Sequence, residues 1–226
     1  MKKTPSFLQR VGGIFSPTVM KRKTDRFIDD LLVRSGLVPE RVDGRGKILH
    51  ISDTPTAIYP YLARLLRRVN PSVVVHTGDL ADNIKLELYS GEERNYQEAI
   101  IKLINIITAP HREVYLFMGN HDNVDLLPRL PLQCRIYEDA AEFQYRGMFF
   151  SASHYFEKVQ ENEADYKLFG HAWQPKSYDE GGQYYLNGVE SMWLIDPGRR
   201  ELRALPYPPR TDNCRTMRVG HGIIRM

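Results

Sequence analysis

Strand and helix patterns alternate in the first half of the chain. Short apolar, β-branched runs predict strands at residues 47–52, 72–78 and 113–119. Between them, leucines and isoleucines at helical spacing predict helices over residues 61–69 and 95–107. This is the rhythm of βαβ units, which predicts a parallel or mixed sheet with helices on both faces.

The second half has strand patterns with little helix between them. Residues 142–154 predict a hairpin that turns at Arg146 and Gly147, and residues 165–171 predict a further strand. Residues 184–196 and 200–207 predict a closing pair around Pro197 and Gly198. Only a short helical region is expected between residues 122 and 130. The chain is therefore predicted to form two packed sheets within one α/β domain.

An extension precedes this domain. Residues 24–35 predict one helix, whose apolar stripe contains Phe27, Ile28, Leu31 and Leu32. Such a stripe needs a cover, and packing on the main domain is the expected one. Contact with a second copy or another partner, or association with a membrane surface, is the alternative.

Composition indicates an ordinary globular chain. It has 226 residues, of which 42% are hydrophobic and 26% charged, and this suits one domain with extensions. No stretch approaches the roughly 20 apolar residues that a membrane span requires. The basic start of the sequence is not followed by an uninterrupted apolar region, so export is not expected. Cys134 and Cys214 lie far apart, which favours free thiols in a reducing compartment and predicts a cytoplasmic location.

Charge is distributed unevenly around the overall +3. Residues 1–46 carry a net charge of +5, residues 47–206 carry −5, and residues 207–226 carry +3. We interpret these as a basic N-terminal extension, the main domain and a basic C-terminal tail. An acidic centre suits cation binding, whereas the basic ends could contact nucleic acid, an anionic surface or a partner subunit. Solvated tails are the plainer interpretation.

Five residues that favour metal ions follow predicted strands: Asp53, Asp79, Asn120, His154 and His171. Carboxylate, amide and imidazole groups bind divalent cations, and layered α/β folds gather their strand ends at one edge. Each residue alone has an ordinary explanation as a turn, cap or structural residue; their recurrence predicts a metal site. The remaining histidines, His50, His76, His111 and His221, are assigned to structure or solvent.

The segment Gly119-Asn120-His121-Asp122 adds a proton-transfer group to this set. The Asn120 amide could bind a metal, the His121 imidazole could move a proton, and the Asp122 carboxylate could orient that imidazole. Packing alone does not explain this order.

Together these motifs resemble the calcineurin-like metallophosphoesterases, in particular their compact bacterial and archaeal type. The family pattern DxH, GDxxD, GNHD, a lone His and GHxH corresponds here to Asp53-Thr54-Pro55, residues 78–82, residues 119–122, His154 and residues 170–173. The resemblance runs from about residue 47 to 205. It implies a four-layer fold, in which two packed mixed sheets are flanked by helices and a two-metal site lies on loops at one edge.

The resemblance also implies a role for each donor. Asp79 would bridge two metal ions, and Asn120, His154 and His171 would complete one sphere. The other sphere would keep Asp53 and Asp79, but its two histidine positions hold Pro55 and Trp173, which cannot coordinate a cation. We therefore expect one tight ion and a second that is weak or absent.

Two functions follow. The first is a metal-dependent phosphoesterase that hydrolyses a phosphomonoester or phosphodiester through metal-activated water, with His121 as general acid and Asp122 holding its ring. Manganese is the expected ion, with Fe, Zn, Ni or Mg as alternatives. The second is a catalytically impaired member that acts as a binding or scaffold module around a structural metal. A third idea, that Asp82, His50 or His221 refills the depleted sphere, is kept open as the least favoured.

Overall fold

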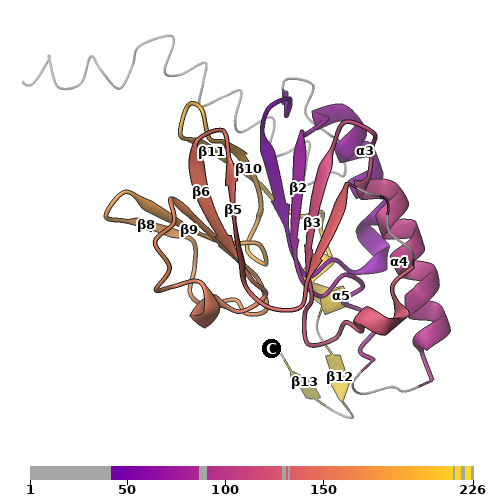
Figure 1. Cartoon of the computed structure of the whole chain (residues 1–226). Helices are drawn as coiled ribbons and strands as arrows, with labels where there is room; N and C mark the ends of the chain where they lie inside the picture. The colour runs from indigo at the N-terminus through magenta and orange to yellow at the C-terminus, as the bar shows by residue number, and fades with distance from the viewer. Residues whose placement is uncertain are drawn as a thin grey trace, which may run out of the picture.

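Six strands form the first sheet, in the order β11-β10-β1-β2-β3-β4 (Figure 1). The computed structural model describes residues 42–86, 91–128, 131, 133–215, 217–219 and 222–224; the expected helix at residues 24–35 and His221 lie outside these ranges. The strands are β1 (Ile48–Ile51), β2 (Val73–Thr77), β3 (Glu113–Phe117), β4 (Cys134–Tyr137), β10 (Met192–Asp196) and β11 (Glu201–Leu205). Strands β1 to β4 are parallel, whereas β10 runs antiparallel to β1 and β11 antiparallel to β10.

Strands β1 and β2 form the centre of this sheet because both of their faces are apolar. All of their residues are buried. Leu49 and Val74 pair in register and pack towards the helices, whereas Ile48 and Val73 pack towards the second sheet. A strand that is covered on both faces has a continuous apolar run rather than alternation, as these two do.

Two helices cover one face of the first sheet (Figure 1). They are α3 (Tyr59–Val69), which follows the 3-10 turn η1 (Thr56–Ile58), and α4 (Glu93–Ile107). Helix α3 ends where Asn70 takes a left-handed conformation at its C-cap. Both predicted helices are confirmed, each beginning two residues before its predicted start.

The second sheet has five strands in the order β5-β6-β7-β9-β8. They are β5 (Ala141–Tyr145), β6 (Met148–Ala152), β7 (Tyr166–Phe169), β8 (Tyr178–Glu180) and β9 (Gln183–Asn187). The predicted hairpin is confirmed: β5 pairs antiparallel with β6, and Arg146 and Gly147 turn with φ of 51° and 80°. Strands β6, β7 and β9 are parallel, so this sheet is mixed as well.

Aromatic side chains join the two sheets. Phe150 of β6 stacks on Phe143 and Tyr166, with ring centroids 5.1 and 4.7 Å apart, and Phe143 stacks on Tyr115 of β3 at 4.3 Å. The first sheet thus packs on helices with one face and on the second sheet with the other, so the prediction of helices on both of its faces is wrong. The predicted α/β fold of two packed mixed sheets with flanking helices is confirmed.

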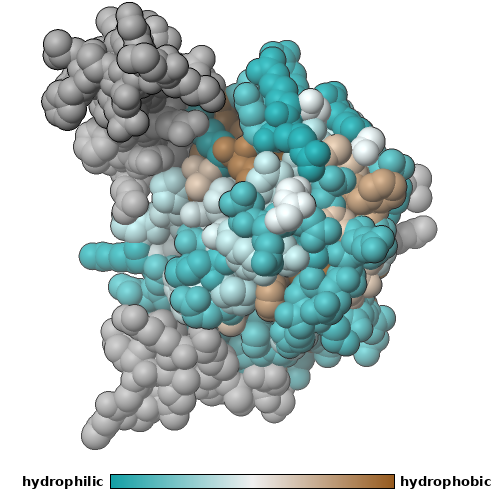
Figure 2. All heavy atoms as spheres, turned by 90° about the vertical axis from the view of Figure 1, so that its left-hand side faces the viewer, coloured by the Kyte–Doolittle hydropathy of each residue, from teal (hydrophilic) through white to brown (hydrophobic). Residues whose placement is uncertain are grey.

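The outer face of the second sheet is turned to the viewer in Figure 2. The described residues visible there are mostly hydrophilic, with a few separate hydrophobic ones. Phe149, on the outward side of β6, is 56% exposed. Within the described ranges this side carries the short turn η3 (Phe156–Lys158) and no long helix.

The prediction for residues 184–196 is partly wrong. They form two strands in different sheets, β9 and β10, and the chain crosses between them at Gly188. Strands β4 and β8 were not predicted. The pairing of β10 with β1 joins residues nearly 150 positions apart, which no local pattern contains. The short helical region is confirmed as η2 (Val124–Leu126).

Helix α5 (Thr211–Arg215) packs against the segment that follows β1. This short helix is followed by β12 (Met217–Val219) and β13 (Gly222–Ile224). Tyr207, Thr211 and Arg215 are buried, so at least this part of the predicted basic tail is integrated into the domain. Of the helices that the structure describes, none combines the length and apolar character needed to cross a membrane.

Candidate metal centre

The carboxyl ends of strands from both sheets meet near α5 (Figure 1). Asp53 follows β1, Asp79 follows β2 and Asn120 follows β3, while His154 and His171 follow β6 and β7 of the second sheet. The loops after β1 and β2 are tied by hydrogen bonds from Asp53 N to Gly78 O and from Thr54 N to Asp79 O, both 3.0 Å long. Parallel strands place their carboxyl ends at one edge, so residues far apart in sequence come together here.

Four of the five donors form one cluster. Nε2 of His154 and Nδ1 of His171 each lie 3.1 Å from Oδ1 of Asn120. These two ring nitrogens are 3.2 Å apart, and Nε2 of His154 is 3.8 Å from Oδ2 of Asp79. The structure therefore brings Asp79, Asn120, His154 and His171 together.

Hydrogen bonds behind the cluster orient its atoms. Nδ1 of His154 lies 2.7 Å from the Thr77 carbonyl, which can only accept, so this nitrogen donates and Nε2 of the neutral ring presents its lone pair to the cluster. Oδ1 of Asp79 accepts from the backbone N–H of His121 at 3.1 Å, leaving Oδ2 towards His154. The Asn120 amide nitrogen lies beside the His121 ring, leaving Oδ1 towards the two histidines.

This arrangement fits a divalent cation. The lone pair of His154 Nε2 faces the side-chain oxygen of Asn120. Both atoms are hydrogen-bond acceptors, so they can lie this close without repulsion only if a cation or a proton is between them. Two donor atoms bound at about 2.1 Å to one ion lie roughly 3.0 to 3.4 Å apart at octahedral or tetrahedral angles. The distances around Asn120 match this spacing, and the Asp79 carboxylate lies slightly outside it.

Asp53 lies beside Asp79 at the edge of the cluster. Donor atoms of Asp53, Asp79 and His154 all fall within 4.8 Å of one another. The Asp53 carboxylate accepts from the Ser52 hydroxyl and from the backbone N–H of His171. These two bonds hold the Asp53 carboxylate close to that of Asp79. Two carboxylates and one shared imidazole are expected to bind a cation more weakly than the four donors of the cluster.

Left-handed backbone conformations mark these loops. Asp53, Asp79 and His171 have φ of 49°, 53° and 68°. Such conformations cost residues other than glycine of the order of 1 kcal/mol or more, and they concentrate at functional sites. The strain here turns each side chain from its strand end into the cluster.

Glycines give the donors room. A Cβ at Gly119 would collide with the Asp79 carboxylate, and a Cβ at Gly170 would collide with Ser52 Oγ and the Asp53 carboxylate. Close approach of backbone to these carboxylates therefore requires the glycine that precedes Asn120 and the one that precedes His171.

Pro55 and Trp173 bring no donor atom to this edge. Pro55 is buried at the start of η1, and its ring has no group that could bind a cation. Trp173 is half-buried, with the Lys176 ammonium 5.2 Å from its ring centroid. The side of Asp79 that faces Asp53 therefore receives no imidazole from either position.

His121 and Asp122 have different surroundings. Nε2 of His121 lies 3.9 Å from Oδ2 of Asp79, and the side chain is 2% exposed. The Asp122 carboxylate accepts hydrogen bonds from the backbone N–H groups of Leu80 and Gly119 and from the Tyr96 hydroxyl. Asp122 thus ties the loops after β2 and β3 to α4; its expected role of holding the His121 ring stays a prediction.

Burial and charge shift the acid–base behaviour of the site. Burial raises the pKa of Asp79 well above its usual range, and the neighbouring Asp53, Asp122 and Asp82 raise it further. Burial also lowers the pKa of His121 to about 4 and lowers that of His171. A bound cation would offset the crowding of negative charge around Asp79.

The sequence interpretation missed several residues that support the site. The Arg215 guanidinium donates to the backbone carbonyls of Asp53, Ser52 and Val189 at 2.7 to 3.0 Å, and it lies 4.1 Å over the Tyr207 ring. Arg215 lies 162 positions after Asp53, so no local signal could have found it. Lys85, which pairs with Asp82, follows that acid at i+3 and was detectable as a neighbouring opposite charge.

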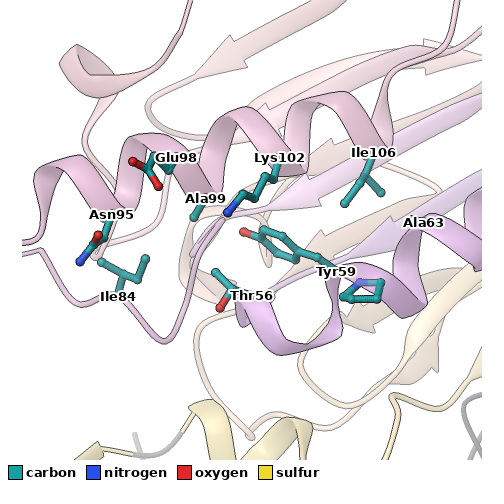
Figure 3. Close-up of a pocket in the computed structure, with 10 residues that line it drawn as sticks. Thr56, Tyr59, Ala63, Ile84, Asn95, Glu98, Ala99, Lys102 and Ile106 are labelled. Atoms are coloured by element: carbon teal, nitrogen blue, oxygen red, sulfur yellow. The ribbon is translucent and has the colours of Figure 1, made fainter.

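One cavity borders the cluster and another lies away from it. One of about 400 Å³ is lined by Asn120, Asp122 and Glu138 among others. A larger one of about 490 Å³ lies between α3 and α4, where Tyr59, Ala63, Ala99 and Ile106 contribute to its wall (Figure 3). None of the residues that line the larger cavity belongs to the cluster. The smaller cavity is thus the one that could admit a ligand to Asn120.

Comparisons with known proteins agree with these motifs. A family model described as calcineurin-like phosphoesterase matches residues 46–203. No curated protein matches the sequence.

Several solved structures are similar to this chain. An archaeal phosphodiesterase shares 15% identity over 70% of this chain and 98% of its own, with a TM-score of 0.48. Yfce, a phosphoesterase from E. coli, shares 17% identity over 70% and 97%, with a TM-score of 0.49. A Vps29 single mutant from Entamoeba histolytica shares 16% identity over 66% and 84%, with a TM-score of 0.42.

The matched segment of the family model includes all five donors, His121 and Asp122. It begins two residues before β1 and ends inside β11, so it spans both sheets. The chain therefore belongs to the calcineurin-like phosphoesterase family.

Proposed function

We propose that this protein is a metal-dependent phosphoesterase, which hydrolyses a phosphomonoester or phosphodiester with one tightly bound divalent cation. The observation that carries the proposal is the convergence of Asn120 Oδ1, His154 Nε2 and His171 Nδ1 within 3.2 Å of one another, next to the buried Asp79 carboxylate. Family membership supports the same reaction class.

In this proposal Asp79, Asn120, His154 and His171 hold the ion, and Asp53 with Asp79 offers a weak second position. When bound, the ion would stabilise a phosphoryl oxygen as a Lewis acid and would lower the pKa of a coordinated water to about 7. Thr77 fixes the tautomer of His154 through its carbonyl, and Asp122 fixes the loop that carries Asn120. These contacts hold the donors before substrate arrives, which limits the cost of reorganisation.

His121 is the proposed proton donor to the leaving oxygen. Burial lowers the pKa of this imidazole to about 4 in the metal-free chain, so the ring is neutral near pH 7. An anionic phosphate ester beside it would favour the protonated form, since an opposite charge raises the pKa of a histidine. Protonation would thus accompany substrate binding, and Asp122 acts as a positioning residue for this loop.

Manganese is the proposed ion. The two imidazoles suit borderline metals, whereas the carboxylate and amide oxygens suit harder ones, and Mn accepts both kinds of donor. Iron, zinc, nickel or magnesium are the alternatives. We also propose a cytoplasmic location, because Cys134 and Cys214 are free thiols.

Hydrolysis of an aryl phosphodiester with added Mn tests this function. His121→Ala should lower kcat by roughly 10²-fold or more if the imidazole transfers a proton in the reaction. The exposed His111, which is bonded to Asn70, provides the matched control His111→Ala, whose rate should equal that of the wild type. If no turnover depends on His121 at any Mn concentration, the proposed phosphoesterase function is wrong.

A second candidate is a binding or scaffold module with a structural ion. Pro55 and Trp173 favour it, because both vacant positions belong to the same metal sphere in the family pattern. This candidate predicts full occupancy of the cluster by one ion and no turnover, together with a stable partner recovered through residues 24–35 or the basic ends. Turnover that depends on His121 would rule it out.

A further inference from the structure

Lys85 is a buried ammonium group at the edge of the metal centre. The residue is 5% exposed, and its Nζ contacts Oδ1 of Asp82, which is itself 2% exposed. Lysine is rarely buried unless an opposite charge compensates it, because removal of an ammonium from water costs several kcal/mol. A buried pair at this place therefore calls for an explanation beyond ordinary surface charge.

The pair lies on the depleted side of the site. Donor atoms of Asp82, Asp79 and His121 lie within 4.8 Å of one another, which puts Asp82 next to the shared carboxylate. The backbone N–H of Asp82 donates to Thr54 O at 3.3 Å, and the N–H of Thr56 donates to the Asn83 side chain at 2.6 Å. These two bonds bracket Pro55, so Asp82 and Asn83 flank one of the two positions that lack a histidine, and Lys85 contacts the Asp82 carboxylate.

Negative charge is concentrated on this side. Asp53, Asp79 and Asp82 are all buried, and donor atoms of Asp79 lie within 4.8 Å of those of both Asp53 and Asp82. Lys85 Nζ contacts the Asp82 carboxylate, and donor atoms of Asp82 and Asp79 lie within 4.8 Å of each other, so a single carboxylate separates the ammonium from the shared carboxylate. Another buried cation, Arg215, donates through its guanidinium to the backbone carbonyls of Ser52, Asp53 and Val189.

We propose that the Lys85 ammonium takes over the charge-compensating role of the missing first metal ion and makes this a one-metal centre. The inference rests on the proposed function, since it concerns the same carboxylates. It also explains how Asp53, Asp79 and Asp82 remain together although Pro55 and Trp173 supply no ligand. A second ion at Asp53 and Asp79 would have to bind against the charge of Lys85.

Mn binding, measured by equilibrium dialysis and elemental analysis, tests this role without turnover. Lys85→Gln keeps a hydrogen-bond donor for Asp82 but removes the charge, so the second Mn ion should bind roughly tenfold more tightly or better than in the wild type. Lys85→Arg keeps the charge, and the cavity of about 430 Å³ that Lys85 lines leaves room for it. This control should bind one ion, as the wild type does.

Each other outcome contradicts the proposal. Equal second-ion affinity in Lys85→Gln and wild type, or the same gain in Lys85→Arg, would show that the charge of Lys85 does not compete with an ion. If Lys85→Gln is unstable, added Mn should raise its melting temperature more than that of the wild type; failure of Mn to do so also overturns the proposal.

The two proposals fail separately. If Lys85→Gln binds a second ion more tightly but no hydrolysis depends on His121, the proposed phosphoesterase function is wrong and the proposed role of Lys85 is supported. Hydrolysis that depends on His121, with unchanged Mn binding in Lys85→Gln, would do the reverse.

Discussion

At the scale of single residues, the site is defined by which donors are present and which are missing. His154, His171 and Asn120 converge at 3.1 to 3.2 Å, whereas Pro55 and Trp173 bring no donor to the neighbouring position. Imidazole cannot be replaced by a pyrrolidine ring or an indole, because neither has an available lone pair. The metal content should therefore depend on these two positions.

Restoring both imidazoles tests this. The double substitution Pro55→His and Trp173→His should raise bound Mn from near one ion per chain towards two, because each imidazole adds a ligand to the carboxylates of Asp53 and Asp79. Elemental analysis after dialysis gives the stoichiometry. The matched control, Pro55→Ala with Trp173→Phe, adds no donor and should leave it unchanged; an unchanged value for the histidine variant would show that the vacant ligand positions lie elsewhere.

At the scale of elements, the end of the chain stabilises the loop after β1. Helix α5 places Arg215 against the carbonyls of Ser52, Asp53 and Val189, and the Tyr207 hydroxyl bonds to Ser52 and Gly188. Backbone carbonyls that follow a buried strand need donors, and here a charged side chain supplies them. The loop that carries Asp53 is thus held by a segment from the far end of the sequence.

Removing this support should destabilise the fold. Arg215→Met keeps the length of the side chain but removes the guanidinium donor from the buried carbonyls of Asp53 and Val189 and one of the two donors from that of Ser52, so the free energy of unfolding should fall by about 3 kcal/mol. Urea denaturation measures it. Arg210→Met, on the exposed residue before α5, is the matched control and should change the free energy by less than about 0.5 kcal/mol. Equal effects of the two substitutions would contradict the role of Arg215.

At the scale of the whole molecule, two histidines of β1 and β2 are buried in an otherwise apolar core, next to the strand ends that carry the candidate metal ligands. His50 and His76 are fully buried, and each has one ring nitrogen without a hydrogen-bond partner among the described residues. Burial lowers the pKa of each to about 3. Because the folded-state pKa lies below the unfolded value, these histidines favour folding above about pH 6.5, and this contribution is lost as the pH falls towards 3.

Substitution of His50 should expose this linkage. His50→Gln keeps a hydrogen-bond donor for Thr77 but has no group that titrates. As the pH falls from about 6 to about 4, the free energy of unfolding of this variant should therefore rise relative to that of the wild type by about 1.4 kcal/mol per pH unit. Urea denaturation of metal-free protein across this range measures the difference. Thr77→Val removes the same bond without removing an ionisable group, so its difference from wild type should stay constant with pH. A pH-independent difference for His50→Gln would contradict the buried neutral state.

Local sequence patterns determined the central strands, both long helices, the hairpin and the order of the motifs. Continuous apolar runs specify β1 and β2, and helical spacing specifies α3 and α4, because these periodicities depend only on neighbouring residues. The five donors and His121 could be named in the same way, since each motif follows its strand directly. Their roles as ligands and proton donor stay predictions.

Only the tertiary structure decided what surrounds these residues. Residues 184–196 are split between two sheets, and Tyr207 and Arg215 are buried. Asp122 bonds to Leu80, Gly119 and Tyr96, and the loop that carries Asp82 bonds to the segment around Pro55. All of these features depend on contacts between segments that are distant in the sequence. Local periodicity in the sequence determines the strands and helices, and therefore which side chains follow each strand. The charge balance of the centre depends on which loops pack together, and long-range packing alone determines that.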